Sequence, residues 1–172
     1  FFTFGGTYLS GVSEASGQAQ LLSEPVKVLL ATNRLFVVGI LFVILGFAFK
    51  VSVFPFHAWT PDVYHGAPTP VTAFMSTAVK AASFIAFLRI FDMDGYTDSK
   101  MLFVILTWMA VLTMFVGNVG AVVQHNVKRM LAYSSIAHSG YLLIGLIAAG
   151  FGNNYSSAAT GLVFYLFSYS IM

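Results

Sequence analysis

Cysteine is absent from the 172-residue sequence, and charged residues make up only 8% of it. The lack of cysteine excludes disulfides and thiolate metal sites, but it does not indicate a cellular compartment. Soluble domains carry about 25% charged residues, whereas 58% of these residues are hydrophobic, so the composition predicts an integral membrane protein. The net charge of +2 and the absence of a basic run argue against nucleic acid as a partner.

The motifs that bind redox cofactors are also missing. The sequence contains no dinucleotide-binding glycine pattern, and without cysteine it has no thiolate ligands for an iron–sulfur cluster. The four histidines do not show the spacing of a zinc site. We therefore expect no cofactor and no metal in this chain.

What the chain has instead is a series of long apolar segments between short polar stretches, the pattern of membrane helices. The ten-residue alternating strands of a membrane barrel are not seen. The fold class that we predict is an all-α, polytopic membrane helix bundle of about five to six helices in a lipid bilayer. After a partial helix at Phe1–Val12, the expected segments are Leu35–Phe49, Pro68–Ile90, Met101–Val123, Met130–Gly150 and Ala158–Met172.

Both ends of the chain suggest a piece of a longer protein. The sequence starts without Met, and it stops at Met172 inside an apolar run. We treat residues 1–172 as one partial membrane domain, and we expect partners of the residues discussed below to lie outside it.

Four of the five prolines crowd into sixteen residues. Proline removes a backbone donor and clashes with the preceding turn, so we predict a helix interrupted near Val53–Pro55, then a short second piece and a loop. Interrupted membrane helices are tolerated where the freed backbone is buried in protein or lines a hydrated cavity, and they recur at ion sites. The residues that we expect to form the break and loop include Pro55, His57, Pro61, Asp62, Pro68 and Pro70.

Lys80 lies near the middle of an otherwise uncharged stretch from Ala67 to Leu88. A cation at that depth costs about 2.5–3.5 kcal/mol on insertion scales, which is usually tolerated only where the charge faces a bundle interior, a partner or water. A buried lysine with a depressed pKa can gain and lose a proton near neutral pH. The structural alternative is a permanent ion pair or a side chain that reaches the interface. Arg89, near the end of the helix, is about 13 Å further along, so the Lys80 side chain is poorly placed to reach the interface.

Lys50 and Lys128 are more ambiguous. Lys50 follows an unbroken apolar run, where an interfacial lysine is the simple interpretation; a helix break just after it would place it at mid-depth. Lys128 and Arg129 precede the next predicted helix, and we expect a cationic turn at the level of the lipid headgroups.

His138 lies inside a predicted span, with Ser134, Ser135 and Tyr141 at spacings that place them on one helical face. Histidine titrates near neutrality, so this group suits a proton relay. A hydrogen-bonding cluster between helices explains the same pattern. The sequence leaves both interpretations open.

Two blocks of the chain resemble a known family. GFAFKVSVFPFHAWTPDVYHGAPTPVTAFMSTAVKAASF, from Gly46 to Phe84, and GNVGAVVQHNVKRMLAYSSIAHSGYLLIGLIA, from Gly117 to Ala148, are similar to subunit N of respiratory complex I. Subunit N is one of the antiporter-like membrane subunits of that complex, and the match covers most of the chain from about Arg34 onward.

The resemblance implies an antiporter-like fold of fourteen helices with two inverted repeats, each with a discontinuous helix. This chain would run from the end of helix six into helix eleven. Lys50 matches the lysine beside the break in helix seven, and Lys80 the lysine of helix eight that leads to the central axis. Lys128 and His138 resemble polar members of the connecting chain. The family's glutamate partner of the helix-seven lysine has no counterpart here.

The expected function is that of a proton-translocating membrane-arm subunit of NADH:quinone oxidoreductase, without redox chemistry in this chain. NADH, FMN, iron–sulfur clusters and quinone would bind on or near other subunits. The expected partners are those membrane subunits, including paralogous antiporter-like ones, in a bacterial inner membrane. A cation/proton antiporter component and a purely structural scaffold with permanent ion pairs remain as alternatives.

Overall fold

The computed structural model describes residues 34–91, 100–152 and 155–171, and every regular element in these ranges is helical. The all-α prediction is confirmed, while the partial helix expected at Phe1–Val12 lies outside the described residues. The elements, of which η2 is a π-helical turn, are α3 (Arg34–Lys50), α4 (Trp59–Gly66), α5 (Thr69–Phe74), η2 (Met75–Val79), α6 (Lys80–Phe91), α7 (Lys100–Val122), α8 (Val127–Phe151) and α9 (Tyr155–Ile171).

In the part of the chain that the structure describes, three helices are long and apolar enough to cross a membrane: Thr69–Arg89, Lys100–Val122 and Val127–Phe151. The first of them runs without interruption through α5, η2 and α6. All three agree with predicted segments to within a few residues. Large apolar side chains lie exposed on the outer faces, among them Phe42, Phe115 and Phe164, as expected for helices with apolar surroundings.

The start of α8 differs from the prediction. The helix begins at Val127, three residues before the predicted Met130, because the Asn126 side chain caps it by accepting the backbone N–H of Lys128 at 3.0 Å. Lys128 and Arg129 therefore belong to the first turn of α8, and the prediction that they precede the helix is wrong. α9 likewise begins three residues earlier than predicted.

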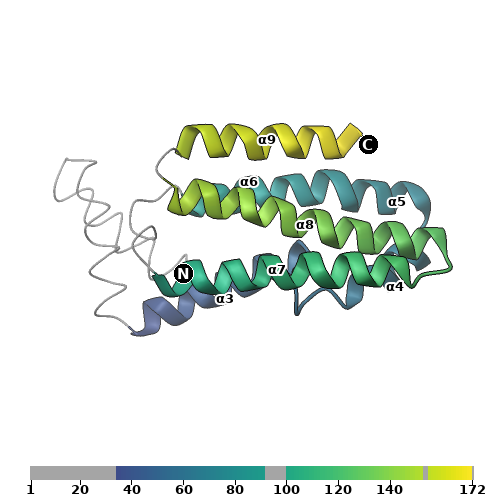
Figure 1. The fold of residues 1–172 in the computed structure, drawn as a ribbon, viewed down its shortest axis with the longest axis horizontal. Helices are drawn as coiled ribbons and strands as arrows, with labels where there is room; N and C mark the ends of the chain where they lie inside the picture. Colours follow the sequence, from purple (N-terminus) through teal and green to yellow (C-terminus); the bar gives the residue numbers. More distant parts are fainter. Residues whose placement is uncertain (1–33, 92–99, 153–154, 172) are drawn as a thin grey trace.

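Helix α8 is the centre of the bundle. Figure 1 shows it lying between α7 and α9 with the axes roughly aligned, and it also contacts α4 and α6. Of the three long helices it is the most buried. The apolar core gathers around it from α3, α6, α7 and α9, with Phe84, Phe87, Leu106, Leu142 and Leu146 among its most buried members.

Two glycines let α7 and α8 approach closely. A Cβ on Gly117 would lie 2.6 Å from the backbone N of Ala137 and 2.9 Å from its Cα. A Cβ on Gly140 would lie 2.6 Å from Cγ of Met114. Small residues at such crossings are characteristic of membrane helices, where tight packing replaces the hydrophobic effect as the main source of association.

The predicted helix break is present, and α3 ends at Lys50. The N–H of Val53 donates to the carbonyl of Ala48 at 2.8 Å, and the N–H of Ser52 donates to the carbonyl of Phe49 at 3.2 Å. Together with the positive φ of Ser52, 63°, these bonds form a Schellman motif, in which glycine usually occupies the position of Ser52. The chain then turns and continues as the short helix α4.

Side chains from other helices satisfy the backbone groups that the break sets free. In a continuous helix the carbonyl of Val51 would accept from residue 55, but Pro55 has no N–H; the Ser139 hydroxyl donates to that carbonyl instead, at 2.7 Å. The N–H of Phe54 donates to Oγ1 of Thr113 at 2.9 Å. Val51, Ser52 and Val53 of the break are thus buried in protein, as interrupted membrane helices require.

Thr113 provides a direct test of this arrangement. The Thr113→Val substitution keeps the shape of the side chain but removes the acceptor for the partly buried Phe54 N–H, which should cost about 1 kcal/mol of stability. The thermal unfolding midpoint of the purified full-length subunit in detergent should fall. Thr160→Val is the matched control, because among the described residues the hydroxyl of the exposed Thr160 bonds only to Ser156 in its own helix; equal shifts in the two variants would contradict the assignment.

Candidate functional site

Lys80 is the first residue of α6 and follows directly on the π-helical turn η2. Its side chain is only 3% exposed. Nζ donates to the carbonyl oxygen of Ser135 at 2.6 Å and to the Ser135 hydroxyl at 2.7 Å. Within residues 34–91, 100–152 and 155–171, the one ion pair joins two other residues, so no described carboxylate pairs with Lys80. Its ammonium is held by neutral oxygens in the bundle interior.

Two tyrosines of α9 extend this contact into a network. The Tyr169 hydroxyl donates to Oγ of Ser135 at 2.9 Å, and the ring centroid lies 5.6 Å from Lys80 Nζ, within cation–π range. His138 contacts the Tyr169 ring at a centroid distance of 4.9 Å, and its Nδ1 lies 2.6 Å from the Tyr165 hydroxyl. Hydrogen bonds therefore join Lys80, Ser135 and Tyr169. A ring contact continues from Tyr169 to His138.

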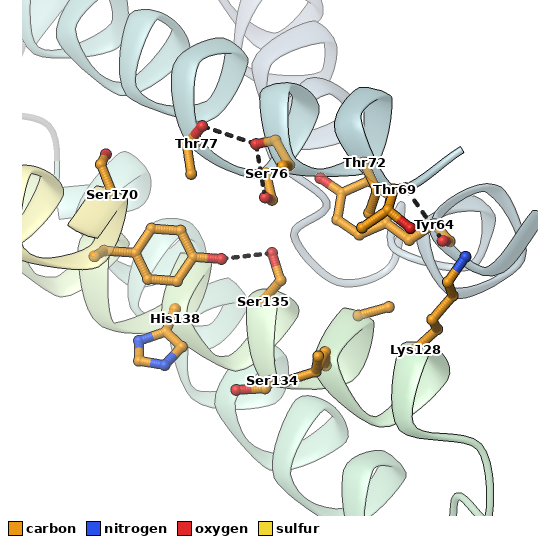
Figure 2. A pocket seen from close by; sticks show the side chains of 14 residues that line it. Tyr64, Thr69, Thr72, Ser76, Thr77, Lys128, Ser134, Ser135, His138 and Ser170 are labelled. Carbon is orange, nitrogen blue, oxygen red and sulfur yellow. Dashed lines mark hydrogen bonds between the residues drawn. The ribbon is translucent and has the colours of Figure 1, made fainter. Parts of the chain in front are cut away.

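A cavity of about 300 Å³ lies beside this network, between the α5–η2 segment, α8 and α9. Figure 2 shows hydroxyl groups from both walls pointing into it, with His138 at one side and Lys128 at the other. A space of this volume has room for several water molecules, and the hydroxyl groups on its walls can bind them. The labelled polar side chains that line it are Tyr64, Thr69, Thr72, Ser76, Thr77, Lys128, Ser134, Ser135, His138 and Ser170.

Tyr64 closes the α4 side of the cavity. Its burial, together with the nearby Tyr169 phenol, raises the pKa of Tyr64 to about 12. The phenol therefore keeps its proton at neutral pH and remains able to donate a hydrogen bond.

The structure brings three of the four predicted relay residues to this region. Lys80 binds Ser135 on the cavity wall, while His138 and Lys128 line the cavity themselves. Lys50 is separate: it ends α3, is exposed on the surface of the described chain, and does not line this cavity. The helix break that the mid-depth interpretation of Lys50 requires is nevertheless in place.

The residues of the proline-rich segment occupy defined positions. Pro55 is exposed in the break, and Pro61 is buried in the first turn of α4, where proline is tolerated. Pro68 is the N-cap of α5, and Pro70 lies in the first turn of that helix. His57 is half-buried, with its ring 5.6 Å from that of Phe54 and its Nδ1 without a hydrogen-bond partner among the described residues.

Asp62 makes a contact that the sequence did not reveal. Its carboxylate pairs with Arg129 at 2.9 Å, which joins α4 to the first turn of α8 beside the cavity. The pairing shows that Arg129 reaches back to α4. The tyrosines of α9 were also missed, although their i, i+4 spacing within one helix was a usable signal.

No group of three His, Asp or Glu side chains in the described parts of the chain is arranged to hold a metal ion. The site consists of two lysines, hydroxyls, phenols and an imidazole beside a cavity whose walls also carry apolar groups. Such groups can pass protons through hydrogen bonds and water.

Comparison with known proteins now decides the family. Residues 3–172 match the model of the family described as NADH:quinone oxidoreductase/Mrp antiporter, TM. The chain belongs to this family. Membership makes it an integral membrane protein and confirms the antiporter-like fold.

The resemblance to subunit N is also confirmed by curated relatives in this family. The NADH-quinone oxidoreductase subunit N of Bdellovibrio bacteriovorus is 56% identical over 99% of this chain and 35% of the relative. The subunit N of Trichlorobacter lovleyi is 43% identical over 100% of this chain and 34% of the relative. The chain thus spans about a third of the length of the curated relatives that it matches.

A solved structure shows the same fold. A chain of the respiratory complex I of Thermus thermophilus is 35% identical and superposes with a TM-score of 0.59, covering 99% of this chain and 34% of that one. This chain therefore shares its fold with a chain of a respiratory complex I structure.

Proposed function

We propose that this chain is part of a proton-translocating membrane-arm subunit of an NADH:quinone oxidoreductase in a bacterial cell membrane. The bacterial relatives named subunit N support the complex, and the match to a complex I chain supports its other membrane subunits as partners. In this proposal NADH, FMN, iron–sulfur clusters and quinone act on or near other subunits. This chain moves protons in response to the electron transfer on those subunits.

The observation that carries the proposal is the environment of Lys80. The ammonium is buried and bound by the carbonyl and hydroxyl of Ser135, without a described carboxylate to fix its charge. A permanent ion pair would hold a proton indefinitely, whereas an ammonium bound by neutral groups can release one. The adjacent cavity, with hydroxyl groups on its walls, supplies room for the water that would accept it.

The proposed path joins the two lysines and the α8 network. Lys50, beside the helix break, loads and releases a proton, and Lys80 passes it laterally. Ser135 and Tyr169 connect Lys80 to His138 through the contacts described above. Lys128, at the other side of the cavity, is the remaining proton-transfer group of the path.

The test replaces both lysines in the full-length subunit of the assembled complex. The Lys50→Met, Lys80→Met double variant should assemble and still reduce quinone in proteoliposomes, but it should translocate far fewer protons per quinone reduced. Normal translocation in that variant would support a structural scaffold. Proton exchange that depends on an added cation and not on quinone reduction would instead indicate an antiporter.

A further inference from the structure

Ser139 lies where the helix break meets the lysine site. It is fully buried on α8, at 0% exposure, one turn after Ser135. Its hydroxyl donates to the carbonyl oxygen of Val51 at 2.7 Å and also lies 3.2 Å from the carbonyl oxygen of Ser135. That second oxygen is the one that accepts Lys80 Nζ.

The two acceptors compete for a single proton. A serine hydroxyl can donate only one strong hydrogen bond at a time, and the distances show that Val51 receives the better one. The ammonium of Lys80 meanwhile supplies a charged donor to the Ser135 carbonyl. If that donor leaves, the Ser139 hydroxyl is in place to turn toward Ser135.

The consequence for Val51 follows from the sequence of the break. Pro55 cannot donate to the Val51 carbonyl, so the Ser139 hydroxyl is its donor in the described structure. A turn of that hydroxyl toward Ser135 would release a buried carbonyl, which is unfavourable in an apolar interior. The backbone next to Lys50 would then have to move or admit water.

We propose that Ser139 is a positioning residue that couples the hydrogen bonding of Lys80 to the helix break beside Lys50. While the ammonium binds the Ser135 carbonyl, the Ser139 hydroxyl donates to the Val51 carbonyl and the backbone of the break stays in place. When the ammonium is absent, the Ser139 hydroxyl turns to the Ser135 carbonyl and the backbone of the break becomes more mobile. This inference rests on the proposed function for its role in proton movement, but the coupling itself can be measured independently.

A cysteine reporter measures that coupling directly. Val53 in the break is 1% exposed, so Val53→Cys, in a full-length subunit that otherwise carries no cysteine, should react slowly with N-ethylmaleimide in the assembled complex. Ser139→Ala should raise the labelling rate by about tenfold, because the Val51 carbonyl loses its donor. Ser139→Thr keeps the hydroxyl and should label at the parent rate.

The decisive measurement is a double-mutant cycle with Lys80. Lys80→Met should also accelerate labelling, and adding it to Ser139→Ala should accelerate it no further, because the break is already released. Effects that multiply, or a Ser139→Ala rate equal to that of the parent, would overturn the inference. Thr107→Val is the control, since within the described parts of the chain the Thr107 hydroxyl bonds only to Phe103 in its own helix; acceleration in that variant would also count against the inference.

Proton translocation separates this inference from the proposed function. Ser139→Ala should lower the protons moved per quinone reduced, with Ser139→Thr restoring the ratio; Ser139→Gly serves if the alanine variant does not assemble. Changed labelling with an unchanged ratio would overturn the positioning role. If Lys80→Met lowers the ratio but the labelling cycle shows no coupling, the inference fails and the proposed function stands; if neither Lys80→Met nor Ser139→Ala changes the ratio, both fail.

Discussion

Replacing Lys80 with Met should reduce proton movement through this subunit by roughly 100-fold, the lower range for losing a proton-transfer group. Methionine fills nearly the same volume, so the bundle should assemble and quinone reduction should continue. The Ser135 hydroxyl and carbonyl lose their charged donor, and the contact with the Tyr169 ring loses its cation. The measurement is the number of protons translocated per quinone reduced by the assembled complex.

An arginine at position 80 distinguishes two roles for Lys80: a group that carries protons and a group that supplies only a fixed positive charge. Arginine keeps its proton under all physiological conditions, so it preserves the charge but cannot release a proton. Lys80→Arg should therefore be as impaired as Lys80→Met. Full activity of the arginine variant would show that only the charge is needed. Lys100→Met, at the exposed start of α7, should behave as the parent.

Replacing Gly117 with Leu should prevent α7 and α8 from packing. Even a single Cβ would come within 3 Å of the Ala137 backbone, and backbone, unlike a flexible side chain, has no rotamer by which to move aside. Overpacking typically costs about 1–3 kcal/mol, and a whole leucine at this contact should reach or exceed the upper end. The full-length subunit should be depleted from membranes, and what remains should melt at lower temperature.

The control for this prediction is Gly161→Leu. Gly161 is exposed on α9, and a Cβ there would meet nothing within 4 Å in the described structure. Both variants add the same side chain to a helical glycine, so they share the change in helix propensity. Similar losses for the two would show that close packing at Gly117 is not the cause.

The sequence predicted the features that depend on local composition. Apolar runs located the helices because a bilayer requires about 20 apolar residues per span. The proline cluster located the break because proline removes a donor wherever it stands in a helix. The mid-span position of Lys80 predicted its burial, since a charge at that depth has few alternatives.

Features that depend on tertiary packing were not predictable. The partner of Lys80 is a backbone carbonyl and a hydroxyl on Ser135, 55 residues away, and many hydroxyls in the chain could have played that part. The backbone of Ser52 is left-handed, but the sequence has serine there instead of the glycine that usually marks such a position. The pairing of Asp62 with Arg129 depends on how α4 lies on α8. The roles of Lys50, Lys80, His138 and Lys128 in proton transfer stay predictions.

The π-helical turn η2 has a geometric consequence for Lys80. Such a turn holds one residue more than an α-helical turn, so all of α6 is rotated by about 100° relative to an uninterrupted continuation of α5. Lys80 is the first residue after that rotation, and it points at Ser135. The direction of the Lys80 side chain is therefore set by the number of residues in the preceding turn, as well as by the oxygen atoms that accept its hydrogen bonds.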